Sequence, residues 1–330
     1  MRILVTGAAG FIGSALCEQL VLSKHEVTAV DNFSDYYDVS LKRLRVKELL
    51  SPLSLEVLNL DICDQSKVEK IIASSNPEVV IHLAAQAGVR LGISESHKYV
   101  ESNLVGFSNV LISTIENKVP KFLYASSSSV YGDQALVPYT ESEKSLNPSS
   151  FYGATKLANE LLVSTVIRNS CTKARGLRFF SVYGPWGRPD MAYFRIISSA
   201  LTGSDFKLFG DGSIERDFTY IHDVVNLIPK LFEELNNHAF GFADVVNLGG
   251  GRPVSINKLV EAVERVTNIK ITPSWAQSHT GDMKRTMSNP AYLEKLTSTS
   301  SFTNLTEGIK ETISWANQSA IKSKLEKWIT

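Results

Sequence analysis

The sequence has few cysteines, no excess charge of either sign and no long apolar run. Its 3 cysteines among 330 residues lack CxxC spacing, and its 6 histidines lack metal-ligand spacing, so we expect reduced thiols and no metal site. The 34 basic side chains match the 34 acidic ones, which argues against a nucleic-acid-binding surface. No signal peptide or membrane span is evident in the sequence. We expect a cytoplasmic protein without nucleic-acid or membrane partners.

Short β-branched runs alternate with amphipathic segments up to about residue 180. The runs predicted as strands are 3–6, 27–31, 55–60, 79–83, 122–126 and 175–180. Helices are expected near 11–22, 65–74, 99–116 and 152–168. Apolar strands separated by helices are typical of a parallel sheet covered on both faces. We therefore predict a doubly wound α/β (Rossmann) domain over residues 1–180.

The pattern changes after residue 180, where prolines and glycines cluster and the strands become short. Helices are expected near 191–202, 222–235, 255–267 and 303–317. We predict a smaller α/β substrate-binding lobe over residues 181–330, with some segments returning to the Rossmann sheet. It would cover the carboxyl ends of the strands, where open α/β folds bind ligands.

A glycine-rich turn joins the first predicted strand to the first helix. Gly7 permits a tight turn, Gly10 a close backbone approach and Gly13 the packing of helix on strand, so that a pyrophosphate can sit on helix-terminal N–H groups. Asp31 ends the next strand, where a carboxylate accepts hydrogen bonds from a ribose and repels a 2′-phosphate. These residues favour NAD over NADP; the alternative is a glycine-rich turn without a ligand.

Tyr152 and Lys156 lie one helical turn apart and share a face. One ammonium at about 4 Å contributes roughly 4 kcal/mol at an effective dielectric of about 20, equivalent to about three units in the pKa of a tyrosine. On many helices such a Tyr-Lys pair is exposed to solvent and has no function. Here it follows the serine-rich strand end at residues 126–129, where a hydroxyl can bridge substrate and phenolate. With an oxidised nicotinamide nearby, the pair predicts an enzyme that moves a hydride and a proton.

The remaining motifs match a known family. The sequence has TGxxGxxG at 6–13, HLAA at 82–85, SSxxVYG at 126–132, YxxxK at 152–156, LRFFxVYGP at 177–185 and RDFTYI at 216–221. Over nearly its whole length it resembles the extended short-chain dehydrogenase/reductase family, the nucleotide-sugar epimerases and dehydratases. The resemblance implies a catalytic triad of Ser127, Tyr152 and Lys156. Tyr152 would take a hydroxyl proton as hydride passes to NAD, and the 4-keto sugar would turn over and receive hydride on its other face.

Further positions are expected along the cofactor. Asp61 and Ile62 follow the third predicted strand and are placed to meet the adenine, although an ordinary loop aspartate is the alternative. Asn103, on the helix after the fourth strand, would support the site through backbone contacts. The complete set expected at the cofactor is Gly7, Gly10, Phe11, Ile12, Gly13, Asp31, Asn32, Asp61, Ile62, Leu83, Ala84, Ala85, Asn103, Tyr152 and Lys156.

Residues beside the triad serine distinguish reactions within this family. Dehydratases carry an Asp-Glu pair at the positions of Ser128 and Ser129, and related decarboxylases carry a Glu at the second position. Here both are serine. Because hydroxyls of ordinary pKa cannot serve as a dedicated acid and base, 4-epimerisation is the economical interpretation.

Residues 31–38, 85–90 and 184–191 resemble UDP-glucuronate 4-epimerases more than UDP-galactose 4-epimerases. Arg188 offers a planar fork of five donors suited to the C6 carboxylate of a sugar, and Ser128 and Ser181 are expected to help. The alternative is a loop-stabilising arginine. UDP-glucose and UDP-N-acetylhexosamines remain alternative substrates, and a catalytically idle nucleotide-binding protein remains an alternative function.

The resemblance also implies contacts to the nucleotide and a partner. It places Arg216 on the diphosphate and Asp282 on the uridine ribose, with Arg90 a further phosphate candidate. His279 stands where relatives often have Arg or Gln. It implies a homodimer formed by a four-helix bundle of helices 99–116 and 152–168, whose apolar residues lie on more than one side.

Overall fold

The central element of the computed structural model, which describes residues 1–88, 93–276 and 283–329, is a seven-stranded parallel sheet. Its strands stand in the order β10-β6-β5-β4-β1-β2-β3. Their bounds are β1 Arg2–Thr6, β2 Glu26–Asp31, β3 Val57–Asn59, β4 Val79–His82, β5 Lys121–Ser127, β6 Lys173–Phe179 and β10 Ala243–Leu248. The predicted doubly wound fold is confirmed. Strands β1, β2 and β3 extend the sheet in one direction, and after β3 the chain crosses to the other side of β1 and continues outward from β4.

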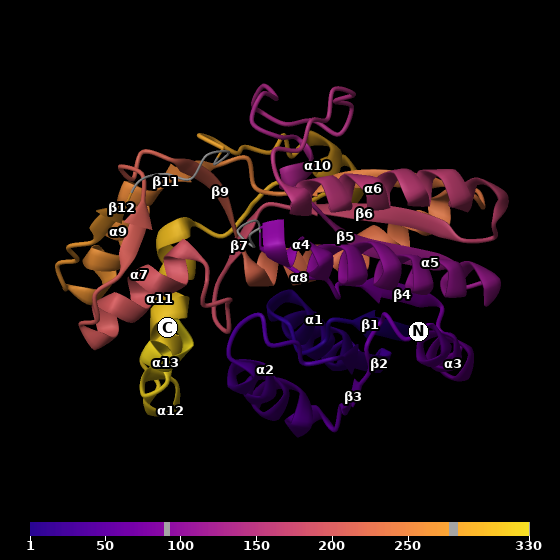
Figure 1. Cartoon of the computed structure of the whole chain (residues 1–330), viewed down its shortest axis with the longest axis horizontal. Coiled ribbons are helices and arrows are strands. Elements are labelled where there is room, and N and C mark those ends of the chain that lie inside the picture. Colours follow the sequence, from indigo (N-terminus) through magenta and orange to yellow (C-terminus); the bar gives the residue numbers. More distant parts are fainter. Residues whose placement is uncertain (89–92, 277–282, 330) are drawn as a thin grey trace.

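Helices cover both faces of this sheet (Figure 1). Helices α1 (Phe11–Leu22) and α8 (Ile221–Glu234) pack on the face to which Ile3 and Val5 point. Helices α3 (Gln65–Ser75), α5 (Phe107–Glu116) and α6 (Phe151–Val166) pack on the face of Leu4. Successive side chains of a strand alternate between faces, so each strand contributes to both cores and is apolar throughout.

Most of the predicted helices are confirmed, and one of them is partly π-helical. The segment expected at 99–116 begins as α4 (Ser96–Tyr99), continues as a π-helical stretch over Val100–Gly106 and ends as α5. Sequence patterns missed α2 (Val39–Arg45), which runs on as a π-helical turn over Val46–Leu50. In the part of the chain that the structure describes, no helix has both the length and the apolar character needed to span a bilayer.

The second half of the chain builds the smaller lobe. Strands β7 (Ser181–Tyr183), β9 (Glu215–Tyr220) and β11 (Pro253–Ser255) form one small sheet, and β8 (Lys207–Phe209) and β12 (Ser274–Ala276) form another. Helices α7 (Ala192–Thr202), α9 (Ile256–Thr267) and α11 (Leu305–Ala316) pack together beside them. Because β10, α8 and α10 (Ala291–Thr297) return to the main sheet, residues after 180 contribute to both lobes.

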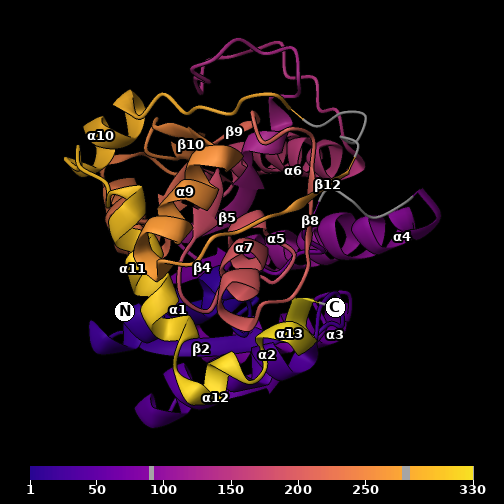
Figure 2. The ribbon, with the colours of Figure 1, turned by 90° about the vertical axis from the view of Figure 1, so that its left-hand side faces the viewer.

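The carboxyl-terminal helices reach back to the first half of the chain. Figure 2 shows α12 (Ser319–Lys322) and α13 (Leu325–Ile329), in yellow, near α2. The Trp328 indole N–H donates to Ser40 Oγ at 3.0 Å, and Lys327 Nζ lies 3.0 Å from Asp38 Oδ2. These contacts fix the start of α2, the helix that sequence patterns missed.

Candidate active site

A cavity of about 850 Å³ lies between the carboxyl ends of the central strands and the smaller lobe. Most of the positions expected at the site line it. They are Gly7, Gly10, Phe11, Ile12, Gly13, Asp31, Asn32, Asp61, Ile62, Leu83, Ala84, Ala85, Ser127, Ser128, Tyr152, Lys156, Ser181, Arg188 and Arg216. Asn103 does not line the cavity. Arg90, His279 and Asp282 lie outside the described residues.

The glycine loop is shaped for a pyrophosphate. A Cβ on Gly13 would lie 2.0 Å from the Gly7 carbonyl oxygen, and one on Gly7, whose φ is +74°, would lie 2.7 Å from Ala84 N. Gly10 immediately precedes α1 and, as a glycine, makes no side-chain hydrogen bond to the helix terminus. The first N–H groups of α1 therefore have no side-chain acceptor, which is the arrangement that binds anions at helix N-termini. The loop fits the dinucleotide expected from the sequence.

Asp31 is held rigidly at the end of β2. Its side chain is 6% exposed, and its two oxygens accept from Ala9 N at 3.0 Å and from Phe33 N at 2.7 Å. Lys42 of α2 lines the same cavity, with Nζ 3.9 Å from Asp31 Oδ1 and 2.8 Å from the Ser34 hydroxyl. A carboxylate fixed at the cavity wall suits a ribose hydroxyl. Lys42 was missed because no helix was predicted there.

Asp61 and Asn103 take different places around the cofactor region. Asp61 accepts from Cys63 N at 2.8 Å and from the Asn32 amide at 3.1 Å, at the cavity wall. Asn103 is buried behind the cavity, where its amide bonds the backbone of Gln86 at 2.8 and 3.1 Å and the Thr155 hydroxyl at 3.2 Å. Asn103 thus connects the loop after β4 to α6.

The structure brings Ser127, Tyr152 and Lys156 together. Ser127 ends β5, and the other two project from the first turns of α6. The Lys156 ammonium donates to the Ala125 carbonyl at 2.9 Å and lies 5.8 Å from the centre of the Tyr152 ring. Burial lowers the pKa of Lys156 to about 8. Burial also raises the pKa of Tyr152, against the lowering effects of the Arg188 charge and of a hydrogen bond with Ser127.

A buried ion pair fixes α6 against the sheet. Glu160, one turn after Lys156, accepts from Arg178 Nε at 2.9 Å and from Arg178 Nη2 at 2.8 Å, and it also accepts from the Ser126 hydroxyl. Both members of the pair are buried. Burial and the neighbouring Glu160 act in opposite directions on the Arg178 guanidinium, and its pKa is raised. Sequence patterns missed this pair, because residues 18 positions apart give no local signal.

Arg188 lines the cavity but already has a carboxylate partner. Its Nε and Nη2 donate to the two oxygens of Asp190, at 3.0 and 2.5 Å, and its side chain is 22% exposed. Tyr36 donates to the same carboxylate at 3.3 Å. Burial opposes ionisation of Asp190, yet the Arg188 charge holds the pKa of Asp190 below its usual value. The pair is therefore ionic.

Two further arginines line the cavity. Arg216 donates through Nη1 to the carbonyls of Glu215 at 2.9 Å and Met283 at 2.7 Å. Arg195 of α7, which sequence analysis did not single out, has a buried Nε with no hydrogen-bond partner among the described residues. A cation with an unused donor in this cavity suits a phosphate.

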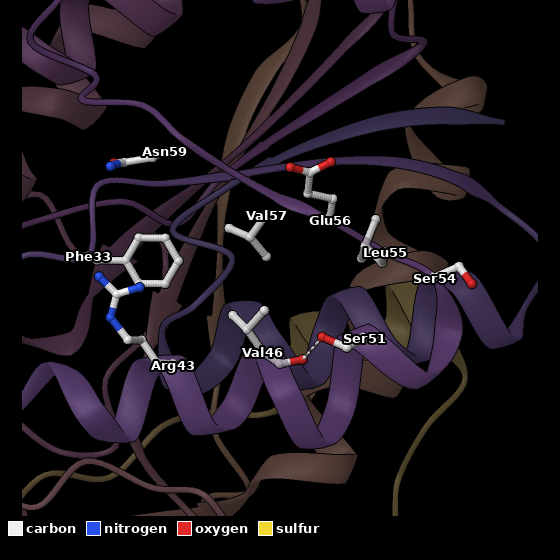
Figure 3. Close-up of a pocket in the computed structure, with 9 residues that line it drawn as sticks. All are labelled: Phe33, Arg43, Val46, Ser51, Ser54, Leu55, Glu56, Val57 and Asn59. Carbon is white, nitrogen blue, oxygen red and sulfur yellow. Dashed lines mark hydrogen bonds between the residues drawn. The ribbon is translucent and has the colours of Figure 1, made fainter.

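A second cavity of about 510 Å³ lies along the outer edge of β3. Figure 3 shows Phe33, Val46 and Val57 around it, with the Arg43 guanidinium against the Phe33 ring, 5.3 Å from its centre. Its lining contains no pair of groups suited to acid–base chemistry. Among the described residues, no cluster of His, Cys, Asp or Glu could hold a metal. The residues expected from the sequence lie in the larger cavity, which is therefore the candidate site.

A parallel sheet with a glycine loop and a Tyr-Lys pair in one cavity defines a dinucleotide-dependent enzyme. Residues 3–249 match the NAD dependent epimerase/dehydratase family, and the chain belongs to that family. A probable UDP-glucuronate 4-epimerase of Rhizobium meliloti is 36% identical, over 96% of this chain and 97% of the relative.

Solved structures agree with this assignment. A UDP-glucuronic acid 4-epimerase from Bacillus cereus, in complex with UDP-glucuronic acid and NAD, has a TM-score of 0.86 at 32% identity, covering 96% of this chain and 99% of that chain. MoeE5, in complexes with NAD and either UDP-glucuronic acid or UDP-glucose, has a TM-score of 0.83 at 30% identity, covering 97% of this chain and 100% of that chain. The cofactor of this family is NAD, as the glycine loop and Asp31 predict.

The buried ammonium of Lys156 predicts how stability changes with pH. Its pKa of about 8 in the folded protein lies below the value of about 10.4 for an unfolded lysine. Between these values the unfolded chain holds a proton that the folded chain has released, so stability should rise with pH. The expected rise is about 2 kcal/mol between about pH 8 and pH 10.

Urea unfolding at several pH values checks this expectation. The Lys156→Met variant should lack the rise, and Lys207→Met, which removes an exposed lysine of the same cavity, should keep it. Equal pH slopes for the wild type and Lys156→Met would contradict the assigned pKa.

Proposed function

We propose that this protein is an NAD-dependent UDP-glucuronate 4-epimerase that converts UDP-glucuronate to UDP-galacturonate through a 4-keto sugar. The observation that carries the proposal is the presence of Ser127, Tyr152 and Lys156 in one cavity with the glycine loop and Arg188. When bound, NAD supplies a hydride acceptor that returns the hydride to the opposite face of C4.

The residues of the chain handle the proton. Tyr152 removes the proton of the sugar 4-hydroxyl as the C4–H bond breaks, and returns it when the C4–H bond re-forms. Ser127, which shares a hydrogen bond with Tyr152, orients the same hydroxyl. The buried Lys156 ammonium favours the phenolate by its charge.

Arg188 supports a uronate as substrate. The 4-keto form of a uronic acid is a β-keto acid, which loses carbon dioxide when its carboxylate turns perpendicular to the ketone. A guanidinium fork and the hydroxyls of Ser128 and Ser181 in the same cavity suit this carboxylate. The ion pair between Arg188 and Asp190 favours UDP-glucose as the second candidate, because it already neutralises the arginine.

A panel of UDP-sugars tests the proposed reaction. The purified protein with NAD should convert UDP-glucuronate to UDP-galacturonate without releasing carbon dioxide. Tyr152→Phe should lower kcat by about 10³-fold, since general acid–base catalysis contributes about 10² to 10⁴, while NAD binding stays. The products are resolved by chromatography. No conversion of any UDP-sugar by protein with bound NAD would instead favour the catalytically idle alternative.

The carboxylate role of Arg188 has its own test. Arg188→Ala should weaken the binding of UDP-glucuronate by about tenfold or more, since a charged hydrogen bond contributes about 1.5 to 3 kcal/mol. It should change the inhibition constant of UDP-glucose little and should allow carbon dioxide release. Isotopically labelled substrate measures that release. Equal losses for both sugars would exclude the carboxylate role.

We also propose that the protein forms a homodimer. Apolar side chains between 38% and 61% exposed lie on the π-helical stretch, α5 and α6. They are Val100, Val105, Ile112, Phe151, Leu161, Leu162 and Val166. Because other faces of these helices already pack on the sheet, this second apolar face needs another partner. A second copy would form the four-helix bundle that the sequence resemblance implies.

A cytoplasmic location remains a prediction from the cysteine pattern.

Sedimentation velocity at micromolar concentration tests the dimer. Wild-type protein should sediment as a dimer, and Leu161→Arg should shift it to monomer by placing a charge in the apolar face. Leu22→Arg, on α1 and equally exposed to solvent (63% against 61%), is the control and should remain dimeric. A monomeric wild type would refute the proposal.

A further inference from the structure

The loop that carries Arg188 has an unusual backbone that needs outside support. Trp186 has φ +62° although it is not a glycine, and Gly184 has φ +143°. The carbonyl oxygens of Trp186 and Gly187 accept from Arg45, from Nε at 2.8 Å and from Nη2 at 2.9 Å. Arg45 ends α2, and these contacts join residues more than 140 positions apart. One guanidinium therefore holds two successive carbonyls of this loop.

The same guanidinium also contacts the glycine loop. Arg45 Nη1 donates to the Ala9 carbonyl at 3.2 Å and to the Tyr37 hydroxyl at 2.6 Å. Ala9 lies in the turn between Gly7 and Gly10, and its N–H donates to Asp31. The rigid, planar geometry of the guanidinium thus sets the distance between the turn expected to hold the pyrophosphate and the loop expected to hold the sugar carboxylate.

Among the described residues Arg45 forms no ion pair, and its guanidinium lies 5.4 Å from the centre of the Tyr37 ring. Its side chain is fully buried, and each of its hydrogen bonds goes to a neutral oxygen. The ion pairs of the neighbouring segments, Lys42 with Asp31 and Arg188 with Asp190, do not include it. A buried charge without a counter-charge is costly. The helix N-terminus beside Ala9 is also positive, so both features favour an anion at the glycine loop.

We propose that Arg45 is a positioning residue that couples the two binding loops, so that a dinucleotide bound at residues 7–13 orders residues 184–190 for the sugar carboxylate. This rests on the proposed function for the role of the second loop. The anionic pyrophosphate supplies the missing counter-charge, the Ala9 carbonyl stays fixed, and Arg45 then holds the Trp186 and Gly187 carbonyls in place. Trp186 and Gly187 do not line the cavity, although Arg188 and Asp190 do, so the Arg45→Lys variant separates coupling through Arg45 from direct contact of the dinucleotide with this loop.

Hydrogen exchange of the wild-type protein, with and without NAD, tests the coupling without any sugar. Peptides covering residues 185–188 should exchange about fivefold or more slowly with NAD, the lower range of typical coupling between sites. Peptides covering residues 10–14 should be protected as well. No change at 185–188 while 10–14 is protected would overturn the proposal. Protection at 185–188 without turnover of UDP-glucuronate would leave the coupling intact and refute the assigned substrate.

Arg45→Lys keeps the charge but loses the planar fork. With NAD it should retain protection at residues 10–14 and lose it at 185–188. KM for UDP-glucuronate should rise about tenfold, while the inhibition constant of UDP, which lacks the glucuronate, changes little. Arg43→Lys, on the exposed side of the same helix, is the matched control and should behave as wild type. An Arg45→Lys variant with wild-type exchange and KM would overturn the proposal. If this variant fails to fold, the wild-type exchange experiment decides alone.

Discussion

The burial of Lys156 against the Ala125 carbonyl is the constraint on which the chemistry of the cavity depends. Tyr152, Lys156 and Glu160 follow one another at four-residue spacing and therefore share one face of α6. Glu160 pairs with Arg178 of β6 and with Ser126 of β5, so the register of α6 against the sheet is fixed. In that register Tyr152 meets Ser127, the last residue of β5. The placement of Tyr152 and Lys156 in the cavity thus follows from the buried Glu160–Arg178 pair, which also accepts from the Ser126 hydroxyl at the cavity wall.

Burial acts on Tyr152 and Lys156 in opposite directions. It raises the pKa of the phenol and lowers that of the ammonium, so each is shifted toward its neutral form. The phenol becomes an effective base only when additional positive charge lies close to it. Arg188 is one such charge, since it lowers the pKa of Tyr152. A residue proposed to bind the sugar therefore also favours the phenolate, and proton removal is linked to the complete assembly of the site.

Motifs that each lie within one segment of the chain predicted much of the arrangement of the cavity, because each motif can be recognised from neighbouring residues alone. The glycine loop follows β1 directly, the serines end β5, and Tyr152 and Lys156 share one helix, so parallel strand order suffices to bring them to one edge. What could not be predicted depends on contacts between distant residues. Helix α2 gave no clear periodic signal, and with it Lys42 and Arg45 were missed. Glu160 looked like an ordinary helix residue until its partner on β6 was known.

The pairing of Arg188 with Asp190 changes the argument for substrate choice. From the sequence alone, Arg188 is expected to offer its fork of donors to the C6 carboxylate of a sugar, with a loop-stabilising arginine as the alternative. In the structure Arg188 forms an ion pair with Asp190, to which Tyr36 also donates. Selection of a uronate by net charge is therefore weak. The geometry can still select it, because the Arg188 Nη1 donors are not used by Asp190 and the hydroxyls of Ser128 and Ser181 line the same cavity. A carboxylate gains from several donors fixed in direction, whereas a hydroxymethyl group satisfies fewer of them. Specificity for a uronate then depends on how rigidly the loop of residues 184–190 fixes the direction of the Arg188 donors.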